Sequence, residues 1–75
     1  MKTVVEFCDM DAIGGGTLVD AFHSKLLPFL PRIGETVYLT KGVHSYTVKG
    51  VFHIFRYKGA VPYEICIRVE LARKV

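Results

Sequence analysis

The segment from Leu30 to Val37 constrains the fold of this chain more than any other part of the sequence. It reads Leu-Pro-Arg-Ile-Gly-Glu-Thr-Val. Pro31 fixes its own φ angle, Gly34 permits a positive φ, and an alternating apolar run follows directly. The segment is therefore predicted to be a turn that leads into a strand. The clear strand patterns come after this turn, whereas the residues before it are ambiguous.

Three runs after the turn, at residues 36–40, 45–56 and 63–71, alternate between apolar and polar residues. Such alternation predicts half-buried strands, separated here by turns at 41–44 and 57–62. Gly50 interrupts the middle run and predicts a β-bulge. In the first two runs Val37, Leu39, Tyr46 and Val48 are predicted to face the core. In the last run Tyr63, Ile65, Ile67, Val69 and Leu71 are predicted to face the core, while Glu64, Cys66, Arg68 and Glu70 face outward.

Before the turn, residues 3–8 are rich in β-branched and aromatic types and predict a first strand. Residues 9–16 end in three glycines and predict a hairpin loop. Residues 17–29 fit two structures. Their periodicity suits a helix that places Leu18, Phe22, Leu26 and Phe29 on one face, but the first strand then has no adjacent partner. We favour a strand over residues 17–27, and a helix over 17–29 remains the alternative.

Taken together, these patterns predict one domain over residues 1–75, an all-β fold with five strands in a small, partly open barrel of the Src-homology-3-like kind. The alternative is an α+β fold with a helix at 17–29. The Pro-x-x-Gly-Glu-x-Val turn from Pro31, the Tyr-x-Val strand from Tyr46, a bend and the alternating last strand resemble short bacterial and phage-encoded small-barrel proteins of unassigned function. The resemblance covers residues 28–71 and implies the barrel fold, with no functional residue carried over.

No motif in the sequence points to catalysis, a metal or a cofactor. The three histidines lie in different segments, the two cysteines lack metal-ligand spacing, and Gly14–Gly16 lacks the Lys-Ser/Thr of a phosphate loop. We therefore expect a protein that is not an enzyme and has no cofactor or metal. The first residues form no signal peptide or membrane span, so we expect a cytoplasmic protein whose thiols, at Cys8 and Cys66, are free and half-buried.

Charge is distributed unevenly along the chain. Residues 1–35 contain three basic and five acidic residues, whereas residues 36–75 contain seven basic and two acidic residues. The basic half is also the half with the clear strands. Phe52, Ile54 and Phe55 are so close in sequence that at least one must leave the core, and an apolar residue on an outer face indicates an interface.

These observations predict a small binding module that docks on another protein, as an inhibitor of a host or defence protein would, or that self-associates into a homo-oligomer. The alternative is nucleic-acid binding through basic side chains interleaved with aromatic ones. No membrane partner is expected. The predicted partner-binding residues are Arg32, Tyr38, Lys49, Phe52, Ile54, Arg56, Tyr57, Lys58 and Arg68.

Overall fold

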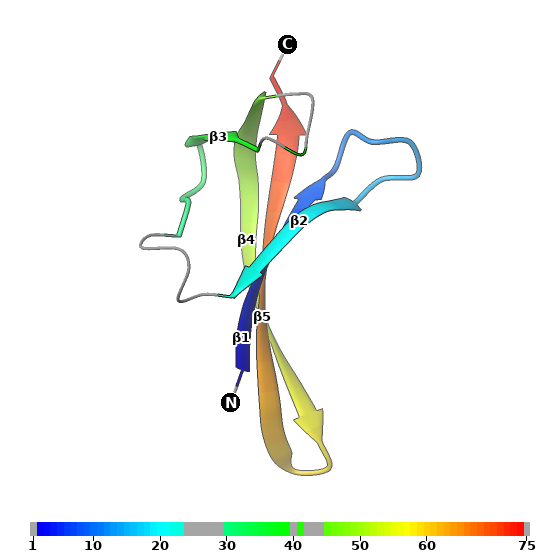
Figure 1. Cartoon of the computed structure of the whole chain (residues 1–75), viewed down its shortest axis with the longest axis vertical. Coiled ribbons are helices and arrows are strands. Elements are labelled where there is room, and N and C mark those ends of the chain that lie inside the picture. The colour runs from blue at the N-terminus through cyan, green and yellow to red at the C-terminus, as the bar shows by residue number, and fades with distance from the viewer. Residues whose placement is uncertain (1, 24–29, 40, 42–44, 75) are drawn as a thin grey trace.

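The computed structural model describes residues 2–23, 30–39, 41 and 45–74, which contain five strands and no helix (Figure 1). The strands are β1 (Lys2–Asp9), β2 (Thr17–His23), β3 (Thr36–Tyr38), β4 (Ser45–Lys58) and β5 (Val61–Arg73). They form one sheet in the order β2-β1-β5-β4-β3. Strands β1 and β5 are parallel, and the other neighbours are antiparallel. The predicted all-β, five-stranded, partly open barrel is confirmed.

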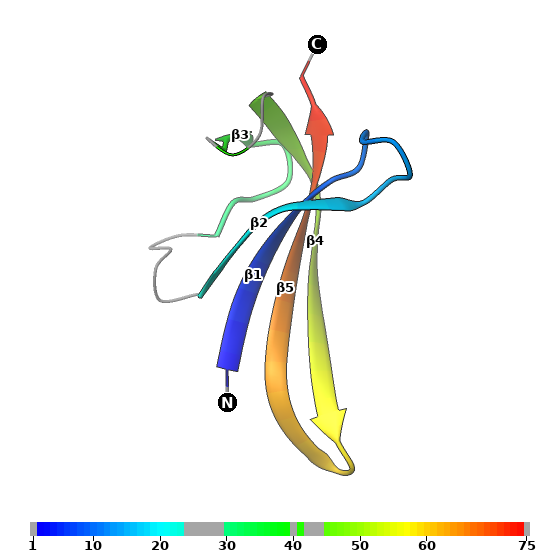
Figure 2. The ribbon, with the colours of Figure 1, turned by 45° about the vertical axis from the view of Figure 1, so that its right-hand side comes forward.

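The sheet curls around one hydrophobic core. Strands β1, β5 and β4 run side by side in a curved layer, and β2 and β3 lie at its two edges (Figure 2). The curl places the core on the inner face, among Val5, Phe7, Tyr46, Val48, Ile67, Val69 and Leu71. The core lies toward one end of the sheet, because β4 and β5 continue past the other strands at the opposite end (Figure 1).

Residues 17–23 form a strand, as favoured from the sequence. Strand β2 pairs with β1 through a hairpin, and the ring of Phe22 packs edge-on against that of Phe7 with centroids 5.9 Å apart. The free edge of β1 and this aromatic contact favour a strand over the helical periodicity. The predictions for residues 24–29, 40 and 42–44 concern positions outside the described residues.

The bulge predicted at Gly50 is confirmed, since the register between β4 and β5 shifts between Val48 and Gly50. A second shift follows Arg56, which faces Glu64, whereas Tyr57 faces Pro62. The predicted turn at 57–62 is wrong in length. Only residues 59 and 60 form the turn, because the pairing of β4 with β5 continues to Lys58 and Val61.

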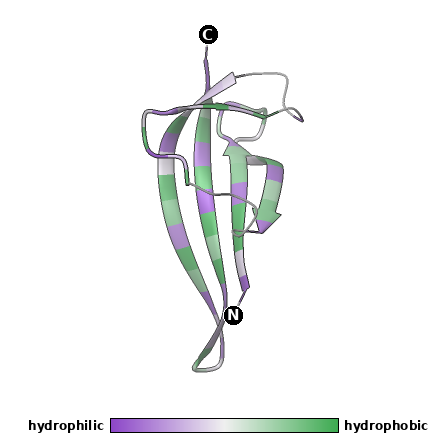
Figure 3. Ribbon diagram, turned by 60° about the vertical axis from the view of Figure 1, so that its left-hand side comes forward, coloured by the Kyte–Doolittle hydropathy of each residue, from purple (hydrophilic) through white to green (hydrophobic). Residues whose placement is uncertain are grey.

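Hydrophobic and hydrophilic residues alternate along the strands (Figure 3), and on β5 the core face is formed by Ile65, Ile67, Val69 and Leu71, as predicted, with corrections at Tyr63 and Cys66. Tyr63 was expected in the core, but it is 50% exposed. Tyr63 is the extra residue of β5 at the register shift after Arg56, and the described part of β1 begins only opposite Glu64. Cys66 was expected to face solvent, but it is only 1% exposed. Its neighbours on the outer face, described below, bury it.

Candidate functional site: the hairpin arm

The ends of β4 and β5 form a hairpin arm, defined here as residues 52–63. The arm extends beyond the N-terminal end of β1 (Figure 1). Every residue of the arm is exposed, although the pairing of β4 with β5 extends to the turn, with one register shift between Arg56 and Tyr57. The chain has a radius of gyration of 12.9 Å, against about 11 Å for a compact domain of this length. The arm therefore adds length to the molecule and little to its core.

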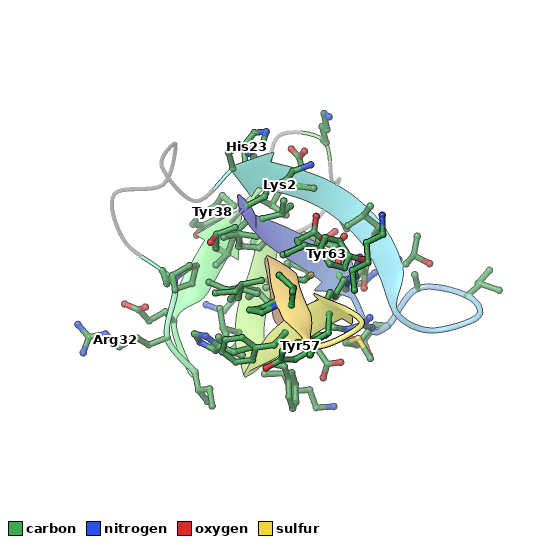
Figure 4. The ribbon with its side chains drawn as sticks, turned by 90° about the horizontal axis from the view of Figure 1, so that it is seen from below. Lys2, His23, Arg32, Tyr38, Tyr57 and Tyr63 are labelled. Carbon is green, nitrogen blue, oxygen red and sulfur yellow. The ribbon has the colours of Figure 1, made fainter. Side chains whose placement is uncertain are left out.

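The arm is rich in large apolar side chains. Six of its twelve residues are exposed large hydrophobic residues: Phe52, Ile54, Phe55, Tyr57, Val61 and Tyr63. Figure 4 views the arm end-on, with the labelled Tyr57 and Tyr63 lying apart on the hairpin. A two-stranded hairpin by itself is only marginally stable in water, and soluble monomers rarely keep large apolar patches uncovered. The arm is therefore the part of the described surface that most needs a partner.

Phe52 is held in place by the backbone bulge next to it. A β-carbon added to Gly50 would lie 2.8 Å from Cε2 of Phe52, so the ring covers the glycine. Phe52 also lies opposite Arg68 in the register of β4 and β5, and Ile54 lies opposite Cys66. Gly50 thus leaves space for an aromatic ring that stays half exposed at the base of the arm.

The basic side chains beside the arm are largely neutralised. Arg56 Nη1 lies 3.1 Å from Glu64 Oε1, and Arg68 Nε lies 3.2 Å from Glu70 Oε2. Glu6 adds a third carboxylate to the same outer face, because it lies opposite Arg68 in the β1–β5 register. Lys2 shares this face, because it lies opposite Glu64 in the same register, so the outer face defined by these six side chains carries three positive and three negative charges.

Lys49 and Lys58 differ from these arginines. Neither lysine forms an ion pair with a carboxylate of the described residues, and both are exposed. On β4, Lys49 lies three residues before the arm begins, and Lys58 lies at the end of the strand, next to the hairpin turn. Lys2, which lies opposite Glu64 at the base of the arm, is likewise exposed and without an ion pair to a described carboxylate, so three lysines near the arm carry charge available to a partner.

The two cysteines lie beneath the outer face. Cys66 Sγ donates a hydrogen bond to Glu6 Oε1 over 3.0 Å, and burial together with this bond raises the pKa of the Cys66 thiol from 9.0 to about 11. Burial also raises the pKa of Cys8. Cys66 lies opposite Val4 and Cys8 opposite Glu70, so about 13 Å of strand separates the thiols. Both cysteines are free and fully buried, not half-buried as expected.

The structure groups most, but not all, of the predicted partner-binding residues. Phe52, Ile54, Arg56, Tyr57 and Lys58 lie together in the arm, Arg68 faces its base, and Lys49 precedes the bulge. Arg32 and Tyr38 do not belong to this group. Tyr38 pairs with Ser45 at the opposite end of β4, and Arg32 lies in the preceding turn, where its backbone N–H donates to the Glu35 carboxylate.

Three exposed arm residues, Phe55, Val61 and Tyr63, were missing from the predicted set. Tyr63 was missed because perfect alternation placed it in the core. The signal that could have found it is the near-symmetric spacing of apolar residues about the short turn at 59–60. Ile13, at the exposed tip of the β1–β2 loop, was also missed, and no neighbouring pattern marks it.

Among residues 2–23, 30–39, 41 and 45–74, no group of three or more His, Cys, Asp or Glu side chains is placed to hold a metal ion. The same residues contain no helix long and apolar enough to span a membrane. No protein-family model, curated protein or solved structure matches the chain.

Proposed function

We propose that this protein is a non-enzymatic binding module that docks through its hairpin arm, either on another protein or on a second copy of itself. The observation that carries this proposal is the exposure of all twelve residues of the arm, half of them large and apolar. Aromatic residues of this kind supply large contact area at low entropic cost and are enriched in protein interfaces. The half-barrel body holds the arm in a fixed direction, because β4 and β5 run from the core into the arm without a break.

The charge distribution favours a protein partner over a nucleic acid. Binding to a phosphate backbone depends on the number of cations that can release counterions. Arg56 and Arg68 are each within ion-pair distance of a glutamate, so Lys2, Lys49 and Lys58 supply most of the available charge near the aromatic residues. Lys58 beside Tyr57, and Lys49 nearer Phe52, support nucleic-acid binding as the second candidate, with the weaker electrostatic basis.

The proposal is tested by affinity capture from cytoplasmic extract with immobilised wild-type protein and two double variants. Phe52→Ser/Ile54→Ser removes apolar area from the arm, whereas Thr36→Ala/Lys74→Ala removes exposed polar side chains at the far end of the sheet. We expect a protein that binds to the wild type and to the second variant and is lost with the first. After purification, the captured protein should bind the wild-type protein in a titration. Equal capture by all three proteins would refute docking through the arm.

The nucleic-acid alternative has its own test. Gel mobility is measured with single-stranded and duplex DNA and RNA at low salt, where electrostatic binding is strongest. We expect no shift beyond that given by a Lys49→Ala/Lys58→Ala control. A shift that the lysine variant abolishes would favour the nucleic-acid function instead.

A further inference from the structure

The outer edge of β4 is free along most of the strand. On the side away from β5, Ser45–Thr47 pair with β3, and Val48 exchanges hydrogen bonds with Gly34 and Glu35. From Lys49 to Lys58 no described residue pairs with this side. These ten residues form an edge about 33 Å long, and the backbone N–H and C=O groups on this side pair with no described residue, which makes the edge a template for another strand.

The middle of this edge lacks the features that normally prevent strand addition. Natural edge strands are protected by charges, prolines or bulges. On β4 the bulge at Gly50 and the charges of Lys49, Arg56 and Lys58 lie near the two ends. The five residues from Val51 to Phe55 contain no Lys, Arg, Asp, Glu or Pro. The other edge strand, β2, carries Asp20 at its centre, paired with Lys41 over 3.3 Å.

We propose that the partner of this edge is a second copy of the chain, and that the two β4 strands pair antiparallel about a two-fold axis at Ile54. The inference rests on the proposed function and names the partner and the binding mode. A two-fold axis makes the interface closed and self-complementary, so association stops at a dimer. The product is one continuous sheet of ten strands.

The sequence of β4 matches itself in this register. Ile54 meets Ile54 of the partner subunit at the axis, and Phe52 lies opposite Arg56 of the partner subunit. On the other face Val51 lies opposite Tyr57 of the partner subunit, and His53 lies opposite Phe55 of the partner subunit. No two cations are directly opposed, and arginine on an aromatic ring is a favourable cross-strand pair.

The exposed area sets the expected strength of the dimer. Phe52, Ile54, Phe55 and Tyr57 are 40–59% exposed, which leaves roughly 100 Å² of each side chain, or about 400 Å² in all, for burial. With the backbone edge this approaches, but does not reach, the roughly 800 Å² that each partner buries in a standard interface. We therefore expect a reversible dimer with a dissociation constant in the micromolar range.

The test is sedimentation velocity of the full chain from about 1 μM to about 1 mM, a range that spans weak interfaces. Wild type should pass from monomer to dimer. Phe52→Glu and Phe52→Lys remove the same ring, and both place a charge opposite Arg56 of the partner subunit. The glutamate would attract this arginine, whereas the lysine would repel it. We expect the lysine variant to dimerise about tenfold more weakly than the glutamate variant. Wild type that stays monomeric throughout, or two variants that dimerise equally, would overturn the proposal.

A second measurement needs no variant and so does not depend on the variants' folding. Amide hydrogen exchange of the wild type is compared at the two ends of the concentration range. Edge pairing predicts slower exchange in residues 51–57 at the high concentration, with unchanged exchange in β2. A dimer without protection of residues 51–57 would overturn the proposal. A monomer that still captures a protein through Phe52 and Ile54 would leave the proposed function intact while this inference fails.

Discussion

Replacing Asp9 by Asn should weaken the fold more than any other change of a single charged group in the described residues. Asp9 is only 4% exposed at the end of β1, and it joins three strands. Its Oδ2 accepts hydrogen bonds from Arg73 Nε over 2.9 Å and from the Tyr46 hydroxyl over 3.4 Å, and its Oδ1 accepts one from the Asp11 backbone N–H over 3.0 Å. An asparagine keeps one carbonyl oxygen but turns a donor toward Arg73.

The cost can be worked from these contacts. A charge-assisted hydrogen bond contributes roughly 1.5–3 kcal/mol, and breaking a fully buried pair costs about 3–5 kcal/mol. The Arg73 side chain is 38% exposed, so water can solvate it in the variant and the lower range applies. We expect a loss of about 2 kcal/mol, equivalent to a fall in melting temperature of about 10 °C for a domain of this size.

The same carboxylate predicts a pH dependence. Burial opposes the ionisation of Asp9, but the hydrogen bonds from Arg73 and Asp11 and the Arg73 charge outweigh it and hold the pKa below its ordinary 3.8. Because the folded-state pKa is the lower one, this stabilisation is complete above about pH 4 and is lost as pH falls through the folded-state pKa. The asparagine variant should therefore lose less stability in acid than the wild type does.

The assay is urea unfolding followed by circular dichroism at pH 7, 4, 3 and 2. Asp20→Asn is the matched control, because its ion-pair partner Lys41 is 69% exposed and the pair should contribute at most about 1 kcal/mol. Equal stability of the two variants at pH 7, or parallel acid curves for wild type and the Asp9 variant, would refute the reasoning.

Two further predictions concern Cys66 and Gly34. Because the pKa of Cys66 is raised from 9.0 to about 11, stability present below pH 9 should fall by roughly 2 kcal/mol as pH rises toward 11; a Cys66→Ala variant with an identical alkaline decline in unfolding measurements would contradict this. Gly34 has φ +91° and its N–H donates to Val48 O over 2.9 Å, so Gly34→Ala should cost about 1–2 kcal/mol by strain. An unchanged melting temperature would show that the turn relaxes, and Thr36→Ala, at an exposed site, serves as the control.

The local sequence patterns predicted the strands well, because alternation reports directly on a sheet with one buried face. Tyr46 and Val48 are buried as expected, and the bulge at Gly50 lies where the alternation changes phase. The parallel pairing of β1 with β5 was beyond such reasoning, since it joins the two ends of the chain. The same pairing explains Cys66, which Glu6 covers from a strand sixty residues away.

The candidate site was predicted in its position but not in its charge. The pairs Arg68–Glu70 and Arg56–Glu64 could have been inferred, since the first two residues share a strand face and the second two straddle the hairpin turn. Counting charges along the chain treated these arginines as available. The extent of the arm could not be predicted, because it depends on where β1 stops covering β5.

The central claim is that the apolar side chains of the arm are available for docking and are not needed for folding. The most direct test is the unfolding free energy of Phe55→Ala, measured at micromolar concentration beside Leu71→Ala. Phe55 is 54% exposed and Leu71 is fully buried. We predict a loss of at most about 1 kcal/mol for Phe55→Ala and of about 2–5 kcal/mol for Leu71→Ala. Equal losses would mean that the arm belongs to the core, and would contradict the claim.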